Sequence, residues 1–179
     1  MLICATPSMF ADLKIIHWPD PRLKKVSAPV QQFDETLAQL ATRMFELMRE
    51  ARGVGLAAPQ VGLNIRLFVM NHSGEPQDDR VYINPILSEA DGEEDGEEGC
   101  LSLPGITANI LRSRTLRIQA QDLAGQIFEQ MESGYVARIW QHETDHLNGI
   151  LLMDRMGESA RIGCRKILRE LEERYKPRK

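Results

Sequence analysis

The stretch WQHETDHLNG, residues 140–149, determines how the rest of the chain is interpreted. On a helix, residues four apart lie one above the other, so His142 and His146 can present two imidazoles to one metal ion. Glu143 lies about 100° further round the helix axis, where it can reach a water molecule beside that ion. The H-E-x-x-H pattern therefore predicts two metal ligands and a general base on one rigid helix.

The residues around this motif predict a central, buried helix over 133–147. Ser133 is a suitable N-cap, and Asn148 followed by Gly149 is a typical helix end. Apolar side chains leave little of the helix surface polar, so we expect neighbouring elements to cover it. These side chains are Tyr135, Val136, Ile139, Trp140 and Leu147.

Apolar spacing predicts two further helices. One begins after the N-cap Asp34 and ends before Gly53. Its apolar residues recur at intervals of three and four, as on one face of a helix. They are Leu37, Leu40, Met44, Leu47 and Ala51. The same kind of spacing over 158–175 predicts an amphipathic C-terminal helix.

Short apolar or alternating runs predict the strands. Residues 65–70 and 81–83 are rich in β-formers and flank a polar turn. Residues 115–121 and 126–132 flank the turn DLAG, which predicts a hairpin. We expect another strand at 150–153, where the sequence is ILLM.

The order of these elements favours an α+β fold. Strands joined by hairpins rather than by βαβ units predict antiparallel or mixed strands packed around the central helix. The acidic, glycine-broken stretch 88–99 is expected to be a solvated loop. A length of 179 residues suits one domain, 1–179, with residues 1–10 as a loose extension.

Composition limits the classes of function. The chain is 42% hydrophobic and 27% charged, and it has no apolar run near the roughly 20 residues of a membrane span. A net charge of −4 argues against nucleic-acid binding. Three widely spaced cysteines form no disulfide framework. We expect a cytoplasmic monomer, and an organellar location would require a longer precursor.

A tetrahedral ion held by two histidines needs a third protein ligand. The downstream carboxylates Glu158 and Glu170 are candidates, and so are the thiols of Cys4, Cys100 and Cys164. Cys100 is the favoured thiol because it lies in a tight, glycine-bounded loop, whereas Cys164 falls on the apolar stripe of the last helix. The residue pattern by itself leaves the choice between a carboxylate and a thiolate open.

Three segments together resemble the peptide deformylase family. They are GVGLAAPQ (53–60), EGCLS (98–102) and QHETDHLNG (141–149). In the same order, they are similar to that family's patterns G-x-G-x-A-A-x-Q, E-G-C-x-S and H-E-x-D-H. The flanking regions are also similar, so the resemblance extends over nearly all of residues 13–179.

The resemblance implies a role for nine residues. The metal ligands are Cys100, His142 and His146, and the general base is Glu143. The two oxyanion donors are the Gln60 side chain and the Leu101 backbone N–H. The substrate-binding residues are Gly55, Val54 and Ile139. Some family members carry an arginine where this chain has Thr107, so no substrate contact is assigned there.

The activity implied is removal of the N-formyl group from the N-terminal methionine of nascent polypeptides, with release of formate. A metal-bound hydroxide would attack the formyl carbon, and Glu143 would take the water's proton and pass it to the leaving amine. The ion implied is Fe²⁺, with Zn²⁺, Ni²⁺ or Co²⁺ as substitutes. A peptidase that cuts internal bonds and a non-catalytic metal-held binding module are the alternative interpretations.

Two further hypotheses concern charged residues. We expect Asp145 to pair with Arg112 and steady the metal helix, and Glu98 to orient the Cys100 loop. Residues 158–179 carry eight Lys or Arg against four Glu, a net +4 on a chain of −4. This basic tail could dock on the ribosome, and an ordinary solvated helix face is the alternative.

Overall fold

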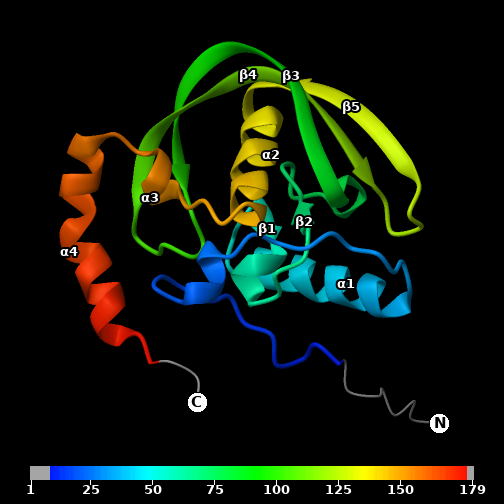
Figure 1. Ribbon diagram of the computed structural model, residues 1–179, viewed down its shortest axis with the longest axis horizontal. Coiled ribbons are helices and arrows are strands. Elements are labelled where there is room, and N and C mark those ends of the chain that lie inside the picture. Colours follow the sequence, from blue (N-terminus) through cyan, green and yellow to red (C-terminus); the bar gives the residue numbers. More distant parts are fainter. Residues whose placement is uncertain (1–8, 177–179) are drawn as a thin grey trace.

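The computed structural model describes residues 9–176 and is built around one antiparallel sheet that arches over a central helix (Figure 1). The strands follow the order β1-β2-β3-β4-β5, each antiparallel to its neighbours. They are β1 Gly55–Ala57, β2 Leu67–Met70, β3 Arg80–Gly99, β4 Thr107–Gln121 and β5 Ile127–Ser133. The expectation of an α+β fold with antiparallel strands is confirmed.

Four α-helices and three 3-10 turns complete the described part of the chain. The helices are α1 Glu35–Glu50, α2 Gly134–Leu147, α3 Leu152–Arg155 and α4 Glu158–Arg174. The turns are η1 Pro21–Lys24, η2 Ala58–Val61 and η3 Pro76–Asp78. Most of the expected loose extension, Cys4, Arg178 and Lys179 lie outside the described residues.

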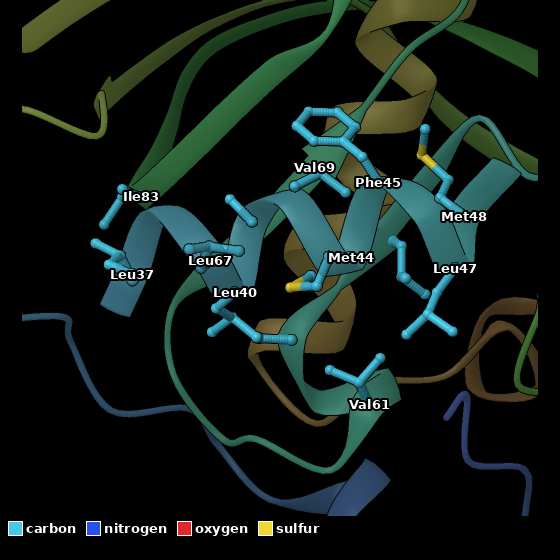
Figure 2. Close-up of a cluster of buried hydrophobic side chains, with 13 residues drawn as sticks. Leu37, Leu40, Met44, Phe45, Leu47, Met48, Val61, Leu67, Val69 and Ile83 are labelled. Atoms are coloured by element: carbon cyan, nitrogen blue, oxygen red, sulfur yellow. The ribbon is translucent and has the colours of Figure 1, made fainter. Parts of the chain in front are cut away.

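Helix α1 forms as its sequence predicts and builds one part of the core. The Asp34 side chain accepts a hydrogen bond of 3.0 Å from the Leu37 backbone N–H and so caps the helix. The apolar face of α1 packs on the side of the sheet that β1 and β2 form (Figure 2). Its members include Leu40, Met44 and Met48, with Leu67 and Val69 opposite. Burial of this face fixes the segment that follows α1, where β1 begins.

Helix α2 lies under the arch and is covered by a second group of apolar side chains. Trp140 is fully buried, and its ring meets that of Tyr82 edge-on at 5.8 Å. Ser133 stands at the N-cap position, but its side chain makes no capping hydrogen bond, contrary to expectation. Gly134, with φ of +61°, instead lets the chain turn from β5 into the helix.

The acidic stretch 88–99 is the outer half of strand β3, so the expectation of a loop is wrong. It pairs with β4 as far as Gly99, which lies opposite Thr107. Two shifts of register interrupt the ladder, and such bulges bend a strand and increase its twist. Composition suggested a loop because most of these acidic side chains face solvent, whereas the backbone pairing depends on β4.

Residues 150–153 are not the expected strand but the entry to helix α3. The Asp154 carboxylate accepts a hydrogen bond of 2.8 Å from the Leu151 backbone N–H, which favours a helical turn. Leu151, Leu152 and Met153 are all buried. A short apolar run is buried in either type of element, so its pattern could not separate them.

Helix α4 lies along the outside of the molecule (Figure 1). Its partly buried residues Cys164, Ile167, Leu168 and Leu171 pack on a third apolar cluster of the core. This cluster includes Leu103, Ile110 and Leu151. Its described arginine and lysine side chains are largely exposed, and docking on the ribosome stays a prediction. Within residues 9–176, no helix is long and apolar enough to cross a membrane.

The antiparallel sheet offers a matched test of core packing. Ile118 on β4 is 0% exposed, whereas Ile127 on the neighbouring β5 is 68% exposed. We expect Ile118→Ala to lower the free energy of unfolding by about 2–5 kcal/mol, because it leaves a cavity in the core. Ile127→Ala should cost less than about 1 kcal/mol. Urea unfolding measures both, and equal losses would contradict this packing.

Candidate metal centre

Three side chains from two segments of the chain converge on one point. The ligand atoms of Cys100, His142 and His146 lie within 4.8 Å of one another. The Cys100 Sγ is 3.3 Å from the His146 Nε2, and the two imidazole rings are 5.0 Å apart. Helix α2 presents both histidines on one face, and the turn after β3 brings the thiol to them. Among residues 9–176 this is the one such group of His, Cys, Asp and Glu side chains.

The geometry decides between the candidates for the third ligand. Glu158, Glu170 and Cys164 belong to α4 and do not join the two histidines. Cys164 packs against the third apolar cluster, as expected for a core thiol. Cys4 lies outside the described residues. Cys100 is therefore the thiol that the fold brings to the histidines.

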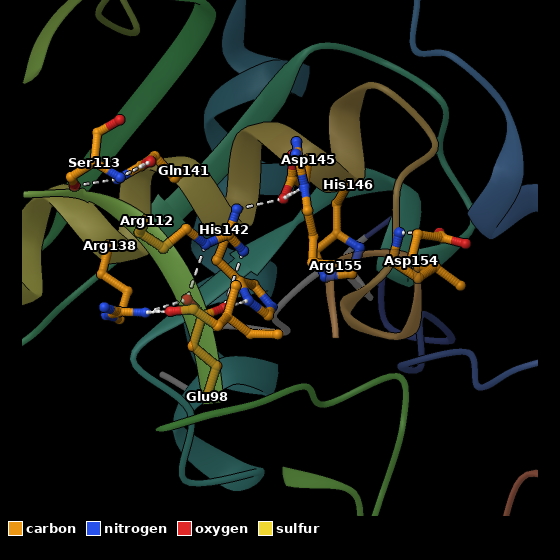
Figure 3. A network of polar contacts seen from close by, with 12 residues as sticks. Glu98, Arg112, Ser113, Arg138, Gln141, His142, Asp145, His146, Asp154 and Arg155 are labelled. Carbon is orange, nitrogen blue, oxygen red and sulfur yellow. Dashed lines mark hydrogen bonds and ion pairs between the residues drawn. The ribbon is translucent and has the colours of Figure 1, made fainter. Parts of the chain in front are cut away.

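The buried carboxylate of Glu98 contacts one of these ligand residues, His142, and two arginines (Figure 3). Its carboxylate lies 2.9 Å from the Nδ1 of His142, accepts two hydrogen bonds from Arg112 and accepts another from Arg138. Burial raises the pKa of Glu98, but its bonds to His142 and Arg112 outweigh burial and lower the pKa to about 2. The carboxylate is thus charged at neutral pH, and it orients His142 with the Nε2 towards the ligand group.

A second carboxylate extends this network along α2. Asp145 accepts a hydrogen bond of 2.5 Å from the Nη1 of Arg112, so the expected pairing is present. It also accepts two hydrogen bonds from Arg155, at 2.6 and 3.0 Å. Arg112 therefore joins Asp145 to Glu98 (Figure 3).

Arg138 and Arg155 also belong to this network, and the sequence did not predict them. Arg138 also donates to the backbone carbonyls of Glu94, Gly96 and Ile110, which ties α2 to the arch. A signal was present, because an arginine four residues before His142 on an otherwise apolar helix requires a buried partner. Arg155 carried no such signal, since its place depends on the unexpected helix α3.

Glu143 faces the ligand group from the same helix. The residue is 4% exposed, and its Oε2 is buried without a hydrogen-bond partner among the described residues. Burial raises the pKa of Glu143 to about 7. Its carboxylate lies against Gly55, where an added Cβ would collide with it. A buried carboxylate with a pKa near neutrality is suited to accept and return a proton.

The predicted site residues meet at one cavity of about 590 Å³. Gln60 is buried there with its amide fixed, because its Oε1 accepts a hydrogen bond of 2.8 Å from the Ala57 N–H. Its Nε2 lies 3.3 Å from the Ser102 Oγ and 3.7 Å from the Cys100 Sγ. Eight of the nine predicted residues line the cavity: Val54, Gly55, Gln60, Cys100, Leu101, Ile139, His142 and Glu143. The ninth, His146, belongs to the ligand group.

These residues fit a transition-metal ion. One thiol and two imidazoles form a donor set that binds iron or zinc, and one more position would stay open to water. Burial lowers the pKa of His146 well below its ordinary value, so the ring is neutral, as a ligand must be. For His142, hydrogen bonds with Cys100 and Glu98 outweigh burial and raise the pKa. A cation would displace the proton held there, as metals do when they bind thiols and imidazoles.

The chain is similar to known proteins over most of its length. Residues 12–161 match the family model described as polypeptide deformylase. A peptide deformylase from Chromobacterium violaceum is 44% identical over 160 residues, which cover 89% of this chain and 96% of that protein. The Plasmodium falciparum peptide deformylase structure has a TM-score of 0.88 at 37% identity and covers 90% of this chain and 96% of its own. The structure of a peptide deformylase from Legionella pneumophila has a TM-score of 0.85 at 40% identity and covers 92% of this chain and 99% of its own.

The position of Glu98 generates a test of metal retention. Glu98→Gln removes the negative charge that orients His142, so we expect the affinity for the ion to fall by about 10–100-fold. Glu94→Gln removes an equal charge from an exposed position on the same strand and should leave the affinity unchanged. Competition with a chelator measures both. Equal retention in the two variants would show that Glu98 has no role in holding the ion.

Proposed function

Because the chain belongs to the peptide deformylase family of metal-dependent hydrolases, we propose that it removes the N-formyl group from the N-terminal methionine of nascent polypeptides. The observation that carries this proposal is the convergence of a Cys–His–His group, a buried glutamate and a fixed glutamine amide on one cavity. Deformylation of nascent peptides is the known activity of the family. The products are formate and a free amino terminus.

Cys100, His142 and His146 would hold the ion. When bound, a divalent ion supplies Lewis acidity, which lowers the pKa of a water molecule towards neutrality. We propose Fe²⁺ as the resident ion and Zn²⁺, Ni²⁺ or Co²⁺ as substitutes, since a thiolate with two imidazoles suits all of them. The same thiolate would make an iron-loaded site sensitive to oxygen, through oxidation of Cys100.

Glu143 carries the proton in this reaction. Its Oε2 has no hydrogen-bond partner among residues 9–176, so it can accept the proton that the attacking water loses. The pKa of about 7 lets the same oxygen return that proton to the leaving amine nitrogen. The C–N bond of the formamide then breaks, and formate leaves with the oxygen of the water.

Gln60 and Leu101 stabilise the charge that develops on the formyl oxygen. The bond from Ala57 holds the Gln60 amide with its Nε2 towards the cavity, so little reorganisation is needed during the reaction. The backbone N–H of Leu101 is the second donor. Val54 and Ile139 supply apolar walls that suit a methionine side chain, and the lack of a side chain at Gly55 lets a peptide backbone come close.

Formate release from a short formyl-methionyl peptide tests the function. We expect anaerobic apoprotein to gain activity with Fe²⁺, and with Zn²⁺ to a different extent. Glu143→Ala should lower kcat by about 10²–10⁴-fold while metal content is unchanged, because it removes the proton carrier. Glu173→Ala, at an exposed position on α4, is the matched control.

Other outcomes of this experiment identify the alternatives. A peptidase would cleave internal bonds of a peptide without releasing formate. A binding module would hold the ion, release nothing and tolerate Glu143→Ala. Either result would overturn the proposal.

The contact between Gly55 and Glu143 generates a second test. Gly55→Ala should displace the Glu143 carboxylate and lower kcat on the order of 100-fold, since small misplacements of a catalytic group are that costly. Metal content should not change, because the three atoms nearest to the new methyl group belong to Glu143 and not to a metal ligand. Gly163→Ala on α4, where a Cβ has open space, should keep full activity. Full activity of Gly55→Ala would contradict the close packing of Glu143.

A further inference from the structure

A second cavity, of about 580 Å³, lies on the other side of helix α2 from the metal centre. Gln141, Thr144 and Asp145 of α2 line it, together with Asn148 at the C-cap. The last three follow Gln141 by three, four and seven positions, so all four share one face. His142, Glu143 and His146 project from a different face of the same helix. The two cavities therefore lie on different faces of one helix, and no residue lines both of them.

Arginine side chains dominate the charge around this second cavity. Arg66, Arg112 and Arg155 line it, against the carboxylates Asp145 and Glu93. Asp145 already accepts hydrogen bonds from both Arg112 and Arg155. Arg112 is also paired with Glu98, so the positive charge of the cavity wall that can attract an anion is that of Arg66.

Arg66 is the arginine whose charge is not matched. Its Nη1 donates to the Asn148 Oδ1 at 2.9 Å and its Nη2 to the Pro85 carbonyl at 3.3 Å, and both acceptors are neutral. No carboxylate among residues 9–176 lies within ion-pair distance of it. Burial lowers the pKa of Arg66, which reflects the cost of a partly buried charge without a counter-ion. An anion in the cavity would relieve that cost.

The second cavity also contains a polar group without a partner. Thr144 is 8% exposed, and its Oγ1 is buried without a hydrogen bond among the described residues. Buried hydroxyl groups almost always have a partner, and this residue lines the cavity next to Asp145. Because this oxygen is enclosed, the Thr144 side chain has to rotate before a ligand oxygen in the cavity can accept the hydroxyl proton.

The rim of the second cavity is apolar. Ile86 on β3 is 60% exposed and Leu111 on β4 is 59% exposed, and both line the cavity. Exposed aliphatic side chains beside a charged floor suit a ligand that has an apolar part next to its charge. Inorganic ions alone would leave this rim without a role.

We propose that the second cavity binds an organic carboxylate joined to a short aliphatic group. The carboxylate pairs with Arg66 and accepts from the Thr144 hydroxyl, and the aliphatic group lies against Ile86 and Leu111. The site is independent of the proposed deformylase activity. A free metabolite and the C-terminus of a peptide both present this chemistry.

The test is titration calorimetry of the metal-loaded protein with 4-methylpentanoate, supported by NMR shifts of the Thr144 and Asn148 amides. We expect Arg66→Gln to weaken binding by about tenfold or more, because it removes a charge-assisted hydrogen bond. Arg165→Gln on α4 removes an equal charge at an exposed position and should change affinity by less than about twofold. Both variants should keep the wild-type activity.

Further ligands assign the chemistry. Leu111→Ser should weaken binding of 4-methylpentanoate but not of acetate, since only the former reaches the apolar rim. The affinity for a tripeptide that ends in a free leucine carboxylate is compared with that for the same tripeptide as its amide. Tight binding of the free acid alone would identify a peptide C-terminus as the ligand, whereas binding of neither would leave a free metabolite. Affinity equal to that of wild type in Arg66→Gln would overturn the proposal, because the carboxylate would then be bound elsewhere, as at the metal. Tighter binding of inorganic phosphate than of 4-methylpentanoate would overturn it as well.

Discussion

The buried carboxylate of Glu98 is the constraint on which the metal centre depends. A charge removed from water is costly unless hydrogen bonds and opposite charges surround it, and Glu98 receives both from Arg112, Arg138 and His142. These partners come from β4 and α2, whereas Glu98 itself is the penultimate residue of β3. Satisfying one carboxylate therefore docks the arch on the helix. Cys100, two residues further along the chain, is brought to the histidines by the same docking.

The arch can come this close to the helix because of its glycines. A Cβ at Gly96 would lie 2.9 Å from the Nη2 of Arg138, so a larger residue would push that guanidinium away from its carbonyl partners. Gly92, with φ of +63°, stands beside a shift in register where the strand bends. The glycines that suggested a loop thus allow strand β3 to curve and the Arg138 side chain to approach it closely.

How much the sequence could predict follows from the range of the interactions involved. The α2 motif and the α1 stripe are local patterns, so their helices and the general placement of His142 and Glu143 could be predicted. The resemblance of three motifs predicted the family, which the comparisons confirm. The β3 arch and helix α3 depend on partners distant in the chain, and both were wrongly predicted. Geometry was also needed to choose Cys100 over Glu158, since spacing does not report which segment folds back onto α2.

The two buried glutamates of the site show how one environment can produce opposite chemical properties. Both lose contact with water, which by itself raises the pKa of each. Glu98 is surrounded by two guanidinium groups and an imidazole, so its pKa falls to about 2 and it stays charged. Glu143 has an oxygen without a hydrogen-bond partner among the described residues, and burial raises its pKa to about 7. A carboxylate that stays charged can only orient its neighbours, whereas one with a pKa near the pH of the solution can take a proton and return it. The proposed roles, proton transfer for Glu143 and orientation for Glu98, thus rest on their hydrogen bonds and not on the motif alone.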